Sequence, residues 1–425
     1  MNKWIKLKDV VIFNRKSYKK NEIPTFVKYL DTGSLTKNKI TKLQYIDTRT
    51  QVLPSRAQRK ISKYSILYST VRPVQEHYGF FESEITNLVV STGFITIDII
   101  DDSIFPKYIY YLLCQNYVTN FLQNVGENSV SSYPSISPHD LGNLRFKVPQ
   151  NILIQKKIAK VLSDLDSKIE LNNKINLQLE EMAKTIYDYW FVQFDFPISK
   201  EIALEMGDPS LEGKPYKSSG GKMIFNKDLN REIPQNWSVV ELSDIAEITM
   251  GQSPSGTSYN ENNEGIIFFQ GSTDFGWRFP AIRQFTNNPK RFAKQGDILL
   301  SVRAPVGDIN IANHNCCIGR GLAALRSKEN YNSYLFYVMK YFKNIFDSRN
   351  KIGTTFGAIT KDDLFSLKLV YPSKTELIAY DNIVKNHNTS IFNNDQQNRQ
   401  LTKLRDWLLP MLMNGQVSAE DIPID

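Results

Sequence analysis

Residue types that bind phosphate or metal ions occur in a few short stretches of this chain. A P-loop needs two glycines bracketing four residues, followed by lysine and a hydroxyl residue, so that backbone amides surround the phosphates. Residues 220–223, Gly-Gly-Lys-Met, lack the first glycine and the hydroxyl. Residues 208–214 contain the carboxylates and the lysine of a metal-dependent nuclease site, but the carboxylates lie too close together and no predicted strand precedes them. Neither stretch predicts an active site.

Histidine and cysteine do not complete a site either. His314 precedes the adjacent pair Cys316 and Cys317, but neighbouring residues on a strand point to opposite faces, and no second cluster supplies four ligands. Core thiols are the favoured interpretation. Residues 319–321, Gly-Arg-Gly, lack the third glycine of a dinucleotide motif, and the Asp/Asn-Pro-Pro-aromatic sequence of an adenine methyltransferase does not occur. We therefore expect no catalytic residue, no metal and no cofactor bound by this chain.

Charge indicates a different kind of chemistry. The formal net charge is +8, and the first 63 residues contain about 16 basic against about 4 acidic side chains, mixed with aromatic ones. This composition favours a phosphate-bearing partner, although a basic surface that serves only solubility is the alternative. Three cysteines suit a reducing compartment, and no apolar run reaches the roughly 18 residues of a membrane span, so we expect a cytoplasmic protein without membrane contact.

The sequence also repeats itself in order, at an offset that drifts from about 232 to about 222 residues. This period is too long for a solenoid, so it predicts two copies of a whole domain-plus-helix unit. The matching segments are residues 65–73 with 297–305, 87–93 with 315–321, and 135–141 with 358–364.

Each copy is predicted to be an α+β domain. A short strand-and-turn signal that ends in Leu-x-Asp-Val/Ile, at residues 7–10 and 242–245, is followed by runs rich in β-branched residues and by an aromatic helix. The predicted strands are residues 64–71, 88–100, 265–270, 297–302 and 315–325, and the predicted helices are residues 108–121 and 334–346.

A long helix is predicted after each domain, over residues 155–191 and 377–413, because apolar residues recur at threes and fours. Two such helices in one chain should pair as an antiparallel coiled coil, in which buried asparagines fix the register. The alternative is that each helix packs only on its own domain. The predicted seam residues are Ile158, Leu162, Leu165, Ile169, Asn172, Leu179, Met182 and Ile186 in the first helix, and Ile391, Asn394, Leu401, Leu404 and Leu408 in the second.

The predicted fold class is therefore α+β, with two duplicated α/β domains separated by two long helices. Residues 1–150 form the first domain, 151–197 a central helical spacer, 198–232 a linker rich in turn-forming residues, 233–372 the second domain and 373–425 a C-terminal helical spacer.

Five stretches carry a resemblance to a known family: residues 155–166, 214–223, 231–237, 242–245 and 408–417. They are similar to the helix entries and domain junction of the specificity subunits of type I restriction-modification systems. The resemblance implies two target recognition domains that each bind half of an asymmetric, bipartite duplex DNA sequence. It also implies helices that set the gap, and docking of methyltransferase and motor-nuclease subunits that use S-adenosylmethionine, ATP and Mg.

DNA-contacting residues are expected among polar and basic side chains in loops, because sequence recognition needs side chains that reach base edges from a rigid frame. In the second domain, Gln252 and Gln270 are the candidate adenine readers. The further candidates there are Ser253, Ser272, Thr273, Arg303, Arg320 and Lys351.

In the first domain the candidates are Lys37, Lys39, Arg56, Arg59, Arg72, Ser131, Ser132 and Tyr133. Arg72 and Arg303 are predicted to match across the duplication, either as phosphate clamps or as structural ion pairs. A coiled-coil adaptor that never touches DNA is the competing function, and only the basic excess of the repeated domains argues against it.

Overall fold

The computed structural model describes residues 2–128, 133–351 and 358–419. The chain divides into two compact units, of which unit 1 is Met1–Asn172 with Gln396–Asp425 and unit 2 is Asn173–Asp395. Each unit contains one globular α+β domain and a section of each of two long helices.

The first domain contains two four-stranded sheets. Its strands are β1 (Asn2–Lys6), β2 (Val11–Phe13), β3 (Phe26–Leu30), β4 (Leu35–Thr36), β5 (Lys39–Ile40), β6 (Gln44–Asp47), β7 (Ala57–Arg59), β8 (Ser65–Ser69), β9 (Tyr78–Phe81), β10 (Leu88–Ser91), β11 (Phe94–Ile99) and β12 (Arg145–Pro149). The sheet orders are β2-β11-β8-β9 and β6-β3-β10-β7, with β1-β12 as a separate pair. Every residue of β8 is buried, because Ile66 and Leu67 face two different apolar clusters.

The second domain repeats this arrangement. Its strands are β15 (Ser238–Glu241), β16 (Ala246–Met250), β17 (Tyr259–Asn260), β18 (Ile266–Phe269), β19 (Phe285–Thr286), β20 (Phe292–Ala293), β21 (Ile298–Ser301), β22 (Ile309–Ile311), β23 (Cys316–Ile318), β24 (Leu322–Ser327) and β25 (Lys368–Tyr371). The orders β16-β24-β21-β22, β19-β18-β23-β20 and β15-β25 reproduce those of the first domain, and β17 is added at one edge. A parallel pair also recurs, as β10 with β3 and β23 with β18. The predicted duplication is confirmed strand by strand.

Short helices explain two of the repeated sequence segments. The predicted strand and turn are confirmed as β1 followed by α1 (Leu7–Val10) and as β15 followed by α7 (Leu242–Ile245). The turn is helical because buried apolar residues three positions apart share one face of it. The segments at 135–141 and 358–364 are capping boxes that begin α4 (Pro138–Gly142) and α9 (Lys361–Phe365). Ser137 and Thr360 supply the capping hydroxyls.

The aromatic helices pack on these sheets with small departures from prediction. The first is divided into α2 (Pro106–Leu113) and α3 (Asn116–Glu127), whereas the second is one helix, α8 (Asn332–Lys351). Tyr111 in α2 and Tyr337 in α8 occupy matching places, and both hydroxyls donate to the long helix α5 (Ile152–Tyr187).

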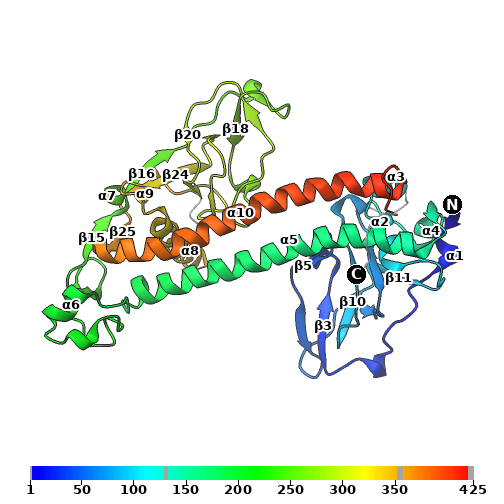
Figure 1. The fold of residues 1–425 in the computed structure, drawn as a ribbon, viewed down its shortest axis with the longest axis horizontal. Coiled ribbons are helices and arrows are strands. Elements are labelled where there is room, and N and C mark those ends of the chain that lie inside the picture. The colour runs from blue at the N-terminus through cyan, green and yellow to red at the C-terminus, as the bar shows by residue number, and fades with distance from the viewer. Residues whose placement is uncertain (1, 129–132, 352–357, 420–425) are drawn as a thin grey trace. The chain divides into compact units, whose positions relative to one another are not determined.

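Both long helices form as predicted and appear as the two long coiled ribbons of Figure 1. α5 continues into a π-helical turn at Asp188–Val192, and α10 spans Lys374–Met413. In unit 1, Asp166 and Asn172 of α5 contact Arg405 and Gln397 of α10, respectively. The residue numbers rise along one helix as they fall along the other, which makes the pairing antiparallel.

Asparagines lie in the interface of both units. In unit 1 the Asn172 side chain is 1% exposed and donates to Gln397 Oε1 and Asn398 Oδ1 at 2.7 and 2.9 Å. In unit 2, Asn394 donates to Asn176 Oδ1 at 2.8 Å, and Tyr380 donates to the carbonyl of Ala183 at 3.2 Å. Buried amides that satisfy one another favour a single register.

Most predicted seam residues face the interior of the helix pair or a domain core. Ile158, Leu162 and Ile391 are buried, and Leu165, Ile169, Leu179, Ile186, Asn394, Leu401 and Leu408 are half-buried.

Two predicted seam residues lie outside the interface. Met182 is 54% exposed and Leu404 is 43% exposed. A heptad places Ala183 four residues after Leu179, and Arg405 four residues after Leu401, at the inward positions. Met182 and Leu404 were predicted to lie in the seam because they are large and apolar. The heptad phase instead places their neighbours Ala183 and Arg405 there.

Residues 198–232, interpreted from sequence as a linker, are folded. They contain α6 (Lys200–Glu205) and β13 (Met223–Asn226), which pairs antiparallel with β14 (Arg231–Pro234). Phe196 stacks on Tyr216 and on Trp237, with ring centroids 4.6 and 4.8 Å apart. The turn-forming residues therefore shape a segment that joins the core of unit 2.

Candidate nucleic-acid interface

Four predicted contact residues come together at one end of the second domain's sheets. Gln252 and Ser253 follow β16, Gln270 follows β18, and Arg320 follows β23. These four residues are called the glutamine cluster below. Gln252, Gln270 and Arg320 are exposed, and Ser253 is half-buried.

Backbone hydrogen bonds and glycines hold the three loops of the glutamine cluster together. Gln252 N donates to Ile318 O at 3.0 Å, and Gly319 N donates to Phe269 O at 2.8 Å. A Cβ on Gly251 would lie 2.2 Å from the carbonyl oxygen of Gly319, and one on Gly319 would lie 2.9 Å from Gln270 Cα. Only glycine permits this approach, so the loops form a rigid frame.

Ser253 links the side chains of the glutamine cluster. Its hydroxyl oxygen accepts a hydrogen bond from Gln270 Nε2 at 2.9 Å and another from Arg320 N at 3.2 Å. The Tyr259 hydroxyl donates to Pro254 O at 3.0 Å and lies 3.4 Å from Gln270 Oε1, and the Tyr259 ring stacks on Phe268. The Gln270 amide is therefore oriented, and it still has one donor and one acceptor position for a partner.

The other candidates of the second domain lie outside the glutamine cluster. Ser272 and Thr273 form a 3-10 turn just after Gln270, and Thr273 is exposed. Arg303 is exposed and pairs through its backbone with Ala358. Lys351 is the last residue of α8, and its side chain lies outside the described part of the chain.

The predicted match of Arg72 with Arg303 is wrong by one residue. Ser69 Oγ donates to Val71 O, and Ser301 Oγ donates to Arg303 O. Val71 forms a bridge with Ser135 just as Arg303 does with Ala358. Arg303 therefore corresponds to Val71, and Arg72 instead has a left-handed backbone with φ of 46°. Arg72 therefore lies one residue beyond the position that matches Arg303, so the duplication no longer assigns the two arginines a shared role.

In the first domain, three candidates belong to neighbouring loops. Arg72 N donates to Pro134 O at 2.9 Å, which brings Arg72 beside the segment that contains the exposed Tyr133. Lys37 N donates to Glu76 O at 3.0 Å, and its ammonium forms an ion pair with the Glu76 carboxylate at 2.6 Å. Ser131 and Ser132 lie outside the described residues.

The remaining basic candidates differ in exposure. Lys39 and Arg56 are exposed, so both can reach a phosphate. Arg59 is half-buried in β7, and burial lowers the pKa of its guanidinium, whose Nε makes no hydrogen bond within the described residues. Arg59 is therefore the weakest of these candidates.

The duplication reveals counterparts of the glutamine cluster that sequence reasoning missed. Leu30 pairs with Val90 as Phe269 pairs with Ile318, so Asp31 corresponds to Gln270 and Thr92 to Arg320. Thr92 N donates to the carbonyl of Arg56 at 2.8 Å, which places Arg56 in the same group. The repeat of 87–93 with 315–321 already aligns Thr92 with Arg320, whereas no repeated sequence leads to Asp31.

The cysteines and histidines do not form a metal site in the part of the chain that the structure describes. Cys316 and Cys317 are both buried in β23, and burial raises the pKa of the Cys316 thiol to about 12. This environment suits a core thiol and opposes a thiolate ligand.

Comparison with known proteins decides the family. The model of the type I restriction modification DNA specificity domain matches residues 2–181 and 234–400. The chain belongs to this specificity family. The putative type I restriction enzyme MjaX specificity subunit of Methanocaldococcus jannaschii is 32% identical, over 97% of this chain and 93% of that protein. The HindI specificity subunit of Haemophilus influenzae is 24% identical, over 93% and 95%.

A solved structure supports the fold of this specificity subunit. The S subunit of a type I restriction-modification system from M. genitalium matches with a TM-score of 0.58 at 15% identity, over 97% of this chain and 96% of that chain. Both matched segments of the family model contain one globular domain and part of a long helix. In the described residues, no helix is both long enough and apolar enough to cross a membrane.

Proposed function

We propose that this specificity subunit binds a bipartite, asymmetric duplex DNA sequence, with each globular domain recognising one half. The observation that carries the proposal is the duplicated strand order. Both domains have the same arrangement of strands, but different side chains in the loops that follow those strands. Gln270 and Arg320 stand in the second domain where Asp31 and Thr92 stand in the first. Different donors and acceptors on one frame would select different bases.

The helices and the partners complete this proposal. Antiparallel helices with amide pairs in fixed register would set the gap between the two half-sites. Methyltransferase and motor-nuclease subunits would dock on this chain and would bring S-adenosylmethionine, ATP and Mg with them. The family membership supports this division of labour, in which the present chain supplies recognition and its partners supply catalysis.

Selection from a random duplex pool tests the proposed function. The full-length chain, purified with its methyltransferase partner, is expected to retain sequences with two conserved blocks separated by an unspecified gap of constant length. Recovery of a single continuous block would contradict two-domain recognition. Recovery of no preferred sequence would favour the coiled-coil adaptor.

Replacing Gln270 tests direct base recognition. Gln270→Ala removes an oriented amide, and a lost bidentate contact costs about 1–3 kcal/mol at one base pair. We expect a relaxed preference at one position of one half-site, measured by competition binding with single-base variants. Gln235→Ala is the matched control, because Gln235 is exposed and lies outside the second domain's strands. A uniform loss of affinity for all sequences would contradict base recognition by Gln270.

Replacing Lys39 tests phosphate binding. Lys39 is preferred to Lys37, whose ammonium already pairs with Glu76. Lys39→Ala is expected to weaken binding to all duplexes alike and to reduce the slope of log affinity against log salt by about 0.9. Titrations at several salt concentrations measure this slope, with exposed Lys227→Ala as control. A changed base preference at unchanged slope would mean that Lys39 contacts bases.

A further inference from the structure

A short segment of the second domain inserts against both long helices within unit 2. Arg278 and Phe279, called the helix anchor below, lie between the 3-10 turn Ser272–Asp274 and β19. The Phe279 ring packs edge-on against Phe392 of α10, with centroids 5.6 Å apart. The Arg278 side chain is 1% exposed, so a charged group has been placed in the interior.

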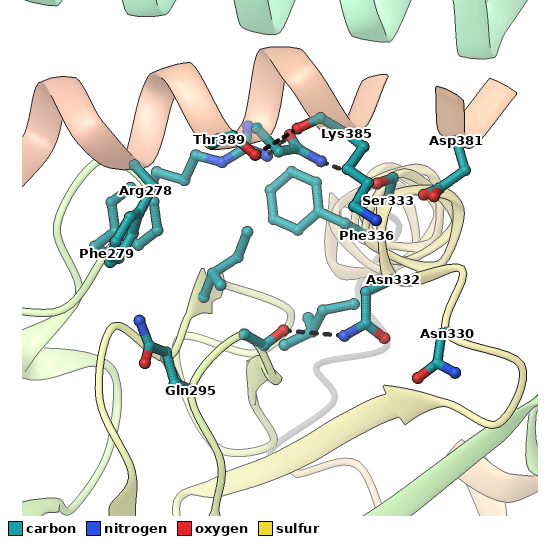
Figure 2. A pocket seen from close by; sticks show the side chains of 16 residues that line it. Arg278, Phe279, Gln295, Asn330, Asn332, Ser333, Phe336, Asp381, Lys385 and Thr389 are labelled. Carbon is teal, nitrogen blue, oxygen red and sulfur yellow. Dashed lines mark hydrogen bonds between the residues drawn. The ribbon is translucent and has the colours of Figure 1, made fainter. Parts of the chain in front are cut away.

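Arg278 links three elements at once. Its Nη1 donates to Glu180 Oε2 of α5 at 2.8 Å, and its Nη2 donates to Asn388 Oδ1 of α10 at 2.5 Å. The guanidinium lies over the Phe336 ring of α8, 4.4 Å from its centroid. Figure 2 shows Arg278 extending along α10 toward the residues beside Thr389, above Phe336.

Polar contacts extend the network around the helix anchor. Lys340 of α8 forms an ion pair with Glu180, and Asn388 Nδ2 donates to Ser333 Oγ at 3.1 Å. A cavity of about 340 Å³ lies beside the anchor, lined partly by Asn332, Phe336 and Lys385 (Figure 2). Close packing therefore does not fill the contact beside the helix anchor, where directional hydrogen bonds join the domain to the helices. Elsewhere in unit 2 an apolar cluster that includes Tyr187, Tyr337 and Tyr380 packs the domain on both helices.

A buried ion pair contributes little net stability, because desolvation offsets the attraction. Such a group is better explained by geometry, since a planar guanidinium with fixed donors accepts only one arrangement of its partners. Here the Arg278 guanidinium joins the second domain to α5 and α10. Arg278 is thus suited to fixing an angle rather than to strengthening the fold.

The helix anchor is also tied to strand β22 of the second domain through the backbone. Arg278 O accepts from Ile311 N at 2.8 Å, and the Asn310 amide bonds both the N–H and the carbonyl of Gly276. Gln270 lies only eight positions before Arg278 along the chain. A rotation of the second domain at the helix anchor would therefore move Gln270 as well.

We propose that Arg278 is a positioning residue that fixes the orientation of the second domain on the helix pair. It thereby restricts binding to targets with one number of base pairs between the half-sites. This inference rests on the proposed bipartite recognition. One base pair adds about 3.4 Å and about 35° of rotation between half-sites, since a turn of 10–10.5 base pairs spans about 34–36 Å. A domain held in one orientation cannot follow that rotation, whereas a released domain can.

The experiment compares duplexes that carry the selected half-sites with gaps one base pair shorter, equal and one longer. Wild-type complex is expected to prefer one gap, and Arg278→Met is expected to lower that preference about tenfold or more while the base preferences within each half-site stay unchanged. Arg326→Met is the matched control, because Arg326 pairs with Asp297 and Gln295 inside the second domain. It should lose stability without losing gap preference.

Unchanged gap preference in a folded Arg278→Met variant would overturn the inference while leaving the proposed function intact. Altered base preferences would also overturn it, because Arg278 would then act on recognition itself. A wild-type protein with no gap preference would instead contradict the proposed function. If Arg278→Met does not fold, Asn388→Ala replaces it in the experiment. This variant removes the acceptor on α10 and keeps the contact of Arg278 with Glu180, and it should lower the gap preference several-fold.

Discussion

Inserting one heptad into each long helix is expected to abolish binding to the original target and to create a target with a longer gap. Seven residues add about 10.5 Å of helix, which corresponds to up to about three base pairs of duplex. Insertions placed between Asn172 and Asn176 of α5, and between Asn394 and Asn398 of α10, keep the heptad phase and both amide pairs. We expect the affinity for the duplex with the original gap to fall at least about a hundredfold, measured by competition binding.

A heptad inserted into α5 alone is the control. It shifts one helix against the other on one side of the insertion, so that Asn172 or Asn176 loses its partner, and a buried unsatisfied amide costs about 1–3 kcal/mol. This variant should unfold at lower denaturant concentration than the double insertion. If the double insertion retained the original gap, the helix pair would not set the spacing.

The second large effect is expected from Gly251→Ala. The new Cβ would lie 2.2 Å from Gly319 O and 2.7 Å from Leu322 O, both backbone atoms that cannot rotate away. The loops must separate, which breaks the hydrogen bonds of Gly251 N and Gln252 N and costs about 1–3 kcal/mol of stability. Loss of two or more base contacts should weaken binding to one half-site about 30-fold or more.

Gly256→Ala provides the matched control for Gly251→Ala, because nothing lies within 4 Å of the Cβ it would gain. Thermal unfolding and binding to targets mutated in either half-site separate the two variants. Gly251→Ala should become insensitive to changes in one half-site and keep its sensitivity to the other. Equal loss at both half-sites would show that the domains do not recognise DNA independently.

Periodic features were predictable because they depend on neighbouring residues. The helix 155–191 and its counterpart follow from apolar spacing, and the capping boxes at Ser137 and Thr360 repeat as a local motif. The seam was less predictable at Met182 and Leu404. Their neighbours Ala183 and Arg405 face inward, and neither small size nor charge marks an interface position in a sequence.

The glutamine cluster was predictable only in part. Gln252, Gln270 and Arg320 stand out as polar residues in glycine-containing loops, but their convergence depends on β18 pairing with β23. For Arg72 and Arg303 the sequence was misleading. Similar surrounding sequences suggested that the two arginines match, but the hydrogen bonds of Ser69 and Ser301 show that Arg303 matches Val71.

Amino-acid order alone establishes the duplication, the two long helices, the basic first domain and the family, because each depends on short or repeated sequence segments. Three-dimensional packing decides which residues meet. Arg278 is 98 positions from Glu180 and 110 from Asn388, and Asp31 shares no sequence signal with Gln270. Such contacts depend on strand order and helix register, which no local pattern contains.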